Sequence, residues 1–407
     1  MALRSSQPRS PQRLSRQQYL RILSAHNGPG RRFSVPGCFL SRKCPAATLE
    51  RWLRRPALNN LQELDFHYGD RFPCCPGSPP PPPPPPPPAS VHRFSSTLRV
   101  ASFGGCGFPD GNASALHFPL LKKLSLLHVQ ISESALHALL AGCPVLQSLV
   151  LSFSSGCRRI RIASRTLRSI GMDPGWGDCR LQHLILEDAP SLERLLCFSY
   201  GRHMAMDISV ISAPKLDILG PLSDDFPRLD FGATIFQGSR LVSLITAVPS
   251  VKILALLNAH LSLDMVINFM KCFPCLEKLY IKTVSLGEKN VWCHKYRNLV
   301  GTLDIRLKKI VLLRYRGNKS HVNFAKFFVL NARVLESMVF EKQERISNEW
   351  IERQHSLLQT RNRASRGAKF DFVYHRCQPG PLRWLGIGLA HDLSTADPFV
   401  RFRDWPD

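Results

Sequence analysis

The sequence predicts an α/β protein, an irregular leucine-rich-repeat solenoid in which a curved parallel sheet is backed by helices. Three observations support this fold class. A short leucine motif recurs along the chain, helix-like segments separate some of its copies, and the leading apolar positions lie roughly 20–25 residues apart. That spacing is typical of a leucine-rich repeat, in which each repeat adds one strand to a stack. We therefore expect an elongated solenoid whose outward side chains form one continuous face.

The recurring motif is Leu-x-x-Leu-x-Leu or a close variant, and in the clearest copies a proline comes just before it. The copies lie at residues 118–126, 143–151, 248–256 and 273–281, with looser ones at 60–66, 97–103, 180–186, 190–195 and 214–219. The last two apolar positions alternate with other residues, which predicts a short strand with one buried face. The proline removes an amide donor and fixes φ, so it marks where each strand begins.

Helices are predicted between some of the strands. Ser132–Leu140 has a serine at the N-cap position and apolar residues at helical spacing, and Gly142 follows as a stop. Residues 264–272 repeat the arrangement before the next strand. The alternative is an ordinary α/β domain with unrelated strands and helices. The number of motif copies favours the solenoid.

Composition changes along the chain predict four parts. We expect a basic, largely disordered N-terminus and linker at residues 1–48, the solenoid at 49–286, a small α+β domain at 287–375 and a loosely ordered tail at 376–407. Within the third part, helices are expected at 322–332 and 347–364, and strands at 303–315, 334–340 and 369–374. The tail is predicted to be loose because it is rich in proline.

A proline run interrupts the solenoid at residues 78–89. Such a run forms a polyproline II rod without hydrogen bonds of its own, so it is expected to loop out of the stack. It could serve as a docking site for a proline-binding module. An expanded low-complexity insertion is the interpretation that we favour.

The formal charge of +24 is extreme and unevenly distributed. Residues 1–57 contain twelve Lys or Arg and a single acid, Glu50, and residues 304–333 contain eight basic residues and Asp304 alone. Such charge favours acidic partners, and nucleic acid is one possibility. A disordered, arginine-rich terminus without a specific partner explains the same composition. No nucleic-acid-binding motif is present in these stretches.

Other features of the sequence concern the cellular compartment. Thirteen irregularly spaced cysteines are typical of a reduced intracellular protein. Residues 1–21 do not resemble a signal peptide, and no apolar run is long enough for a membrane helix. We expect the chain in the cytoplasm, in the nucleus or in both, without a membrane partner.

Catalytic and metal-binding motifs were also considered. Cys272, Cys275, Cys293 and His294 could supply zinc ligands, but Cys272 and Cys275 also occupy the strand start of a repeat, which is the favoured interpretation. The sequence contains no phosphate-binding glycine loop, nucleophile elbow or His-Glu-x-x-His motif. We therefore expect no catalytic residue, no metal site and no cofactor.

If the solenoid binds a partner, the outward strand positions are the candidate contacts. The residues selected on this basis are Lys123, Ser125, His183, Glu187, Lys278, Tyr280 and Lys282. Tyr280, which lies between two lysines, is the strongest anchor candidate, because aromatic and basic residues dominate binding energy at interfaces. For most of the others individually, simple solvation of a polar face is the favoured explanation.

The C-terminal sequence resembles a known domain. Leu307–Leu312, Tyr315–Asn318, Asn323–Ala332 and Val334–Glu336 are similar to the FBD domain of plant F-box proteins. Residues 93–102 and the repeats that follow resemble the irregular leucine-rich region of the same family, and residues 24–33 resemble its linker. The resemblance covers about residues 20–375. It identifies the small α+β domain at 287–375 as FBD-like.

The resemblance implies a non-catalytic module that selects a protein substrate for a ubiquitin ligase. In that family, an N-terminal F-box binds the Skp adaptor of a cullin complex and the leucine-rich face holds the substrate. Residues 1–23 lack the Leu-Pro-Asp start and the helix of an F-box. We therefore expect an N-terminally truncated form, through either the gene model or the protein itself, which reaches Skp and cullin subunits only if a longer form supplies the F-box. The alternatives are a basic, nucleic-acid-associated protein and a degenerate family member without a partner.

Overall fold

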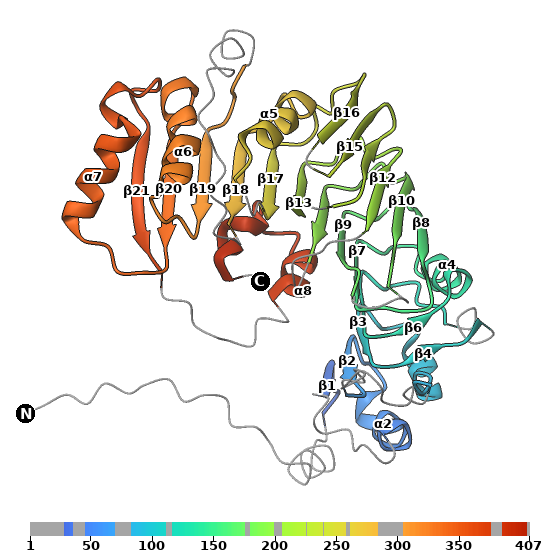
Figure 1. Ribbon diagram of the computed structural model, residues 1–407. Coiled ribbons are helices and arrows are strands. Elements are labelled where there is room, and N and C mark those ends of the chain that lie inside the picture. Colours follow the sequence, from blue (N-terminus) through green and yellow to red (C-terminus); the bar gives the residue numbers. More distant parts are fainter. Residues whose placement is uncertain are drawn as a thin grey trace, which may run out of the picture.

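The structure, a computed structural model, describes residues 28–35, 45–69, 83–110, 116–175, 180–198, 206–224, 226–238, 240–257, 261–283, 304–375 and 385–404. Within them, a sheet of 13 strands curves into an arc (Figure 1). Its strands, in spatial order, are β1 (Arg32–Val35), β2 (Glu63–His67), β3 (Val100–Gly104), β5 (Lys123–Leu127), β7 (Ser148–Ser152), β9 (Ser169–Asp173), β11 (Arg194–Cys197), β13 (Ile218–Ser223), β17 (Ile253–Leu257), β18 (Lys278–Lys282), β19 (Lys309–Leu313), β20 (Ser337–Lys342) and β21 (Lys369–Tyr374). Every neighbouring pair is parallel.

The leucines of the motif fill the core between this main sheet and an outer layer. On β5, Leu124 and Leu126 are fully buried, and the register aligns them with Leu149 and Leu151 on β7. Each buried leucine contributes about 1.5–3 kcal/mol relative to an exposed one. Since a single strand could not bury this side, the stack is what stabilises each repeat. The predicted leucine-rich-repeat fold is confirmed.

Five helices of the outer layer are α2 (Pro45–Leu53), α4 (Glu133–Ala141), α5 (Leu263–Cys272), α6 (Lys319–Asn331) and α7 (Asn348–Leu358). Four of them begin with the same N-cap, in which a side-chain oxygen accepts a hydrogen bond from the amide three residues later. The capping residues are Ser132, Ser262, Asn318 and Ser347. A cap of this kind is worth about 1 kcal/mol. Ser132 therefore has the role that the sequence predicts.

A second sheet takes the place of helices in the middle of the outer layer, between α4 and α5 (Figure 1). Its strands are β8 (Arg159–Ala163), β10 (His183–Asp188), β12 (Asp207–Val210), β14 (Leu229–Phe231), β15 (Thr234–Gln237) and β16 (Arg240–Leu244). A two-stranded ribbon, β4 (Gly107–Phe108) with β6 (Gln130–Ile131), extends the layer toward the N-terminal repeats. The repeat copy at 180–186 was expected to supply a strand of the main sheet. It supplies β10 of the outer sheet instead, because its leucines alternate as in a strand but pack on the core from outside.

The FBD-like part continues the main sheet. β18 pairs with β19 at five consecutive positions, and β20 and β21 follow in the same parallel order. Its two outer helices, α6 and α7, cover these strands just as α4 and α5 cover the earlier ones (Figure 1). The core is therefore shared between the repeats and the FBD-like part.

The end of the proline run contacts the repeat stack. The carbonyl oxygen of Pro85 accepts a hydrogen bond of 2.9 Å from the amide of Gly107, and the hydroxyl of Tyr68 lies 3.4 Å from the carbonyl oxygen of Pro86. Pro88 then leads into a 3-10 helix, η3 (Ala89–Phe94). Residues 78–82, in which the run begins, lie outside the described residues, as do residues 1–27 of the basic N-terminus.

The tail was expected to be loosely ordered, and for residues 385–404 this expectation is wrong. They form α8 (Leu385–His391) and a 3-10 segment, η7 (Pro398–Asp404), which lie inside the curve of the main sheet (Figure 1). Pro398 fits at the start of such a turn, because a helix needs no amide donor at its first position. The apolar residues Ala390, Phe399 and Phe402 anchor the segment on the sheet.

Candidate protein-binding face

The inner face of the main sheet presents a row of thirteen side chains, of which six are basic and one is acidic. The register aligns the first inner position of successive strands, which we call the first row: Arg32, Glu63, Val100, Lys123, Ser148, Ser169, Arg194, Ile218, Ile253, Lys278, Lys309, Ser337 and Lys369. Glu63 is its single acid, and it pairs with Arg32 at 3.6 Å. The first row therefore favours a partner with carboxylates or other anions.

A cluster of apolar side chains, separate from the main core, includes Ile218 and Ile253 of the first row and extends beside it. This inner apolar cluster consists of Leu127, Val150, Leu196, Phe198, Ile218, Ile253, Ala255, Leu257, Tyr280, Val311 and Leu313. It runs across the strands β5, β7, β11, β13, β17, β18 and β19. A contiguous apolar surface of this extent must be covered by something, because soluble proteins rarely leave one open to water.

The C-terminal residues 385–404, which we call the C-terminal segment, cover this cluster. Ala390, Phe399 and Phe402 are almost completely buried against it. The ring of Phe399 lies 5.9 Å from the ring of Tyr280. On β9, a Cβ built on Gly171 would meet the Cβ of Ala390 at 3.1 Å, so the absence of a side chain there lets α8 approach the sheet.

Arg194 of the first row holds the end of α8. Its guanidinium donates hydrogen bonds to the carbonyl oxygens of Asp392, at 2.8 Å, and of Thr395. A cation at this place satisfies carbonyls that lack partners within the helix and complements the negative end of the helix dipole. The side chain is almost completely buried, and burial lowers the pKa of Arg194 from its usual value. The segment thus provides the hydrogen-bond acceptors that a buried guanidinium needs.

Asp397 connects the C-terminal segment to β18. One carboxylate oxygen accepts hydrogen bonds from the hydroxyl of Tyr280, at 2.7 Å, and from the ammonium of Lys278, at 3.2 Å. The other accepts a hydrogen bond from the amide of Phe399, at 3.0 Å, and so caps the start of η7. Burial, together with the carboxylate of Asp397, raises the pKa of the Tyr280 phenol well above its usual value, so the phenol stays protonated and donates.

His391 lies between two serines of the sheet. Its Nδ1 is 2.7 Å from the hydroxyl of Ser148, and its Nε2 is 2.5 Å from that of Ser125. The Ser148 hydroxyl donates to the carbonyl oxygen of Ala390, which assigns it as acceptor from Nδ1–H and leaves Nε2 to accept from Ser125. Burial, with a smaller effect from Lys123, lowers the pKa of His391 to about 3. The ring is therefore neutral at physiological pH.

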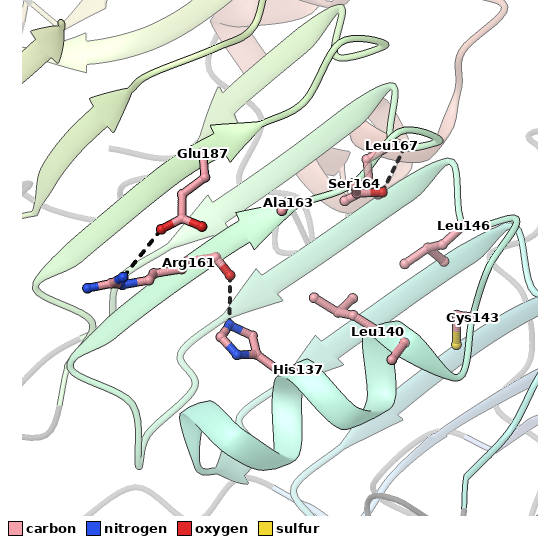
Figure 2. Close-up of a pocket in the computed structure, with 10 residues that line it drawn as sticks. His137, Leu140, Cys143, Leu146, Arg161, Ala163, Ser164, Leu167 and Glu187 are labelled. Atoms are coloured by element: carbon pink, nitrogen blue, oxygen red, sulfur yellow. Dashed lines mark hydrogen bonds and ion pairs between the residues drawn. The ribbon is translucent and has the colours of Figure 1, made fainter.

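The outer face has a groove of about 290 Å³ between α4 and β8 (Figure 2). His137 makes a 2.8 Å hydrogen bond with the carbonyl oxygen of Arg161, whose guanidinium lies 3.4 Å from Glu187. The remaining lining is mainly apolar and includes Cys143, whose thiol pKa is raised to about 12 by burial. The polar groups of the groove therefore bind one another.

Among the described residues, no group of three or more His, Cys, Asp or Glu side chains is placed to hold a metal ion. Cys272 is buried, and burial raises its thiol pKa to about 12, whereas Cys275 is half-buried. Cys293 and His294, the other members of the considered zinc set, lie outside the described residues. The described part of the chain also contains no helix long and apolar enough to cross a membrane.

Comparison with known families decides the identity of the fold. A model described as the leucine-rich repeats of the FBD-associated F-box protein At5g56370 matches residues 49–281, which is more than half of the chain. The chain belongs to this family. The FBD model matches residues 297–340, which contain β19 and most of β20.

A curated relative supports the same family over a shorter part of the chain. The chain is 32% identical over 119 residues to the F-box/LRR-repeat protein At3g03360 of Arabidopsis thaliana. The match covers 28% of this chain and 24% of that protein, so the chain spans about a quarter of its relative's length. Membership in an F-box/LRR/FBD family is typical of a protein-interaction module.

The structure brings five of the seven predicted site residues together. Lys123, Ser125, Lys278, Tyr280 and Lys282 lie on the inner face. However, Ser125, Tyr280 and Lys282 were expected to be solvent-exposed and are instead 2–3% exposed. The cover provided by the C-terminal segment explains Ser125 and Tyr280, which it contacts directly.

The other two predicted residues lie elsewhere. His183 and Glu187 belong to β10 in the outer sheet, where His183 is 3.1 Å from Asp207 and Glu187 is near Arg161. They were assigned to the inner face because the local pattern of alternating residues is the same in both sheets. The selection also missed His391, Asp397 and Phe399. The signal for the last two was present, since Asp-Pro-Phe is an N-cap sequence.

Proposed function

We propose that this chain recognises a protein substrate through the inner face of its main sheet, as the substrate-binding part of an F-box ubiquitin ligase. The observation that carries the proposal is the inner apolar cluster together with a first row whose net charge is positive. Interfaces combine apolar anchors with charged groups in this way. Membership of the F-box/LRR/FBD family supports the same function.

In this proposal the chain does no chemistry itself and uses no cofactor. It holds a substrate protein while a Skp–cullin complex, reached through an F-box, presents ubiquitin. Substrate selection of this kind takes place in the cytoplasm or the nucleus, and we propose the same location for this protein. The chemistry of the reaction belongs to other subunits, so residues of the inner face are expected to affect binding and not a catalytic rate.

The test uses two first-row lysines on strands that follow β18 in the sheet, of which Lys309 lies 5.9 Å from the ring centre of Tyr280. Lys309→Glu with Lys369→Glu reverses two charges on β19 and β21. A control, Lys271→Glu with Lys319→Glu, makes the same change in net charge on α5 and α6. Proteins close to each full-length variant are labelled in plant cells, and the candidates are then measured as purified proteins against each variant.

A partner that binds wild type and control equally, and the inner-face variant at least tenfold more weakly, would support the proposal. Equal binding of a partner to all three proteins would contradict it. A polyanion is the second candidate ligand, since the net charge of the chain is +24 and the first row has six basic residues and one acid. Binding that is lost on nuclease treatment and falls steeply with salt would favour that candidate, because phosphate contacts release counterions.

A further inference from the structure

The C-terminal segment meets the side chains of the inner face without adding a strand to the sheet. The described contacts of α8, η7 and the residues between them are one carboxylate, one imidazole, four backbone carbonyls and a few apolar groups. This manner of contact is how short helical segments bind to a groove, not how successive repeats stack.

The cluster under the segment is separate from the main core. The leucines of the motif pack between the main sheet and the outer layer, and the C-terminal residues Ala390, Phe399 and Phe402 do not join them. Loss of the segment would therefore expose the inner apolar cluster and leave the main core as it is. Either the segment or another molecule must cover that surface.

The pattern of contacts defines what the inner face accepts. At β18, a carboxylate is received by Lys278 and the hydroxyl of Tyr280, and an aromatic ring two residues later lies against Tyr280. A second aromatic ring, that of Phe402, follows one turn further on and packs on Phe399, with ring centroids 5.8 Å apart. The ligand chemistry is an acidic residue followed by aromatic residues in a short helical turn.

We propose that the C-terminal segment is an internal ligand of the inner face, and that the protein partner displaces it with a segment of the same chemistry, a carboxylate followed by aromatic side chains. This inference rests on the proposed function and names the class of partner. Occupancy of the inner face by the segment then weakens binding of the partner. The apparent affinity of the partner is reduced by the fraction of molecules in which the inner face is free.

The probe is a fluorescein-labelled peptide of residues 394–404, and its binding to the full chain is followed by fluorescence polarisation. In the wild type, the tethered segment should keep the peptide out. The double variant Asp397→Ala, Phe399→Ala weakens docking of the chain's own C-terminal segment and leaves the peptide unchanged. The wild-type peptide should therefore bind this variant at least tenfold more tightly than the wild-type chain. Adding Lys278→Ala and Tyr280→Phe to that double variant should remove the gain.

Two controls make the result decisive. A peptide with Asp397→Ala and Phe399→Ala should not bind the released variant, and hydrogen exchange of residues 397–404 should be faster in that variant than in the wild type. Faster exchange without tighter binding of the wild-type peptide would overturn the inference, as would equal binding of the two peptides.

The same peptide separates this inference from the proposed function. A partner found by the charge-reversal test should be displaced by excess wild-type peptide and should speed hydrogen exchange in residues 397–404. A partner that depends on Lys309 and Lys369 but leaves that exchange unchanged would overturn the inference while the proposed function stands. The wild-type peptide could bind the released variant as expected while no partner depends on the inner face. That result would contradict both the proposed function and the displacement of the segment by a protein partner.

Discussion

The hydroxyl of Tyr280 donates a hydrogen bond of 2.7 Å to the carboxylate of Asp397, 117 residues further along the chain. This contact joins β18, the tenth strand of the main sheet, to the start of the last described turn of the protein. It also means that the residue with the strongest binding chemistry on the inner face is occupied. The protein therefore contains both a binding surface and a segment that covers it.

The Tyr280–Asp397 hydrogen bond should be the strongest single polar contact at η7. Tyr280→Phe removes a donor from a carboxylate that is 6% exposed, so we expect the docked state to lose about 1–3 kcal/mol. Lys278→Ala should cost less, because its side chain is 36% exposed and water can replace its contact. Hydrogen exchange of residues 398–402 measures both changes. A larger effect of Lys278→Ala would show that the charge, and not the phenol, holds the segment.

Arg194 should stabilise α8 through its buried hydrogen bonds. Arg194→Ala leaves the carbonyls of Asp392 and Thr395 without this donor, and we expect a loss of about 2 kcal/mol in local stability. The matched control is Arg168→Ala, which removes a surface pair with Glu193 and should cost about 0–1 kcal/mol. Hydrogen exchange in residues 386–396 should increase in the first variant only. Equal exchange in the two variants would argue against the role of Arg194.

Docking of α8 should depend on pH through His391. The pKa of this ring is about 3 when docked and near 6.5 when released, so the released state binds the extra proton. Docking is therefore at full strength above pH 6.5 and weakens as the pH falls below it, by about 2 kcal/mol at pH 5. The charged group that acts on the ring is Lys123 on β5, and Asp392 is the next residue in the chain.

Hydrogen exchange of α8, corrected for intrinsic rates, should rise between pH 7.5 and pH 5 in the wild type. Asp392 does not titrate in this window, since hydrogen bonds from Ser394 and Thr395 lower its pKa to about 2. In His391→Gln, which lacks a titrating ring, the dependence on pH should largely disappear. The same slope in both proteins would assign the effect to another group.

Gly317 should be required for the start of α6. Its φ is +70°, and an added Cβ would lie 2.6 Å from the amide of Gln354, whose side chain accepts a hydrogen bond from Tyr315. Gly317→Ala combines backbone strain with this clash, so we expect the chain to be destabilised by about 2 kcal/mol. Gly367→Ala is the control, because its Cβ would meet open space and its φ is not positive. Chemical denaturation compares the two, and similar midpoints would contradict the expectation.

The repeats could be predicted because each one has the same sequence pattern. Leucines at fixed spacing mark the strands, and serines such as Ser132 and Ser347 mark the helix starts, so a local reading of the chain is enough. The outer sheet was harder to predict. The alternation in Arg159–Ala163 and His183–Asp188 reads as strand in either layer, and only the packing of the whole stack decides which layer it joins.

The inner face was predicted in part. Alternation placed Lys123, Ser125 and Tyr280 on it, but the segment that covers them occurs once in the chain and has no repeat to reveal it. The Asp-Pro-Phe sequence at Asp397–Phe399 indicates the start of a helical turn, but its docking on the inner face is evident only when the apolar surface that receives it is known. A contact between residues so far apart in sequence leaves no periodic signal.

The most direct test of this account is photocrosslinking from position 399 of the full chain. Phe399 is replaced with azidophenylalanine, the protein is illuminated, and the crosslinked peptides are mapped by mass spectrometry. Azidophenylalanine at Tyr374, which is 43% exposed at the end of β21, is the control. The account predicts crosslinks from position 399 to residues 278–282 of β18, next to Tyr280, and none there from position 374. Crosslinks from position 399 to the outer helices, or none to the inner face of the sheet, would contradict it.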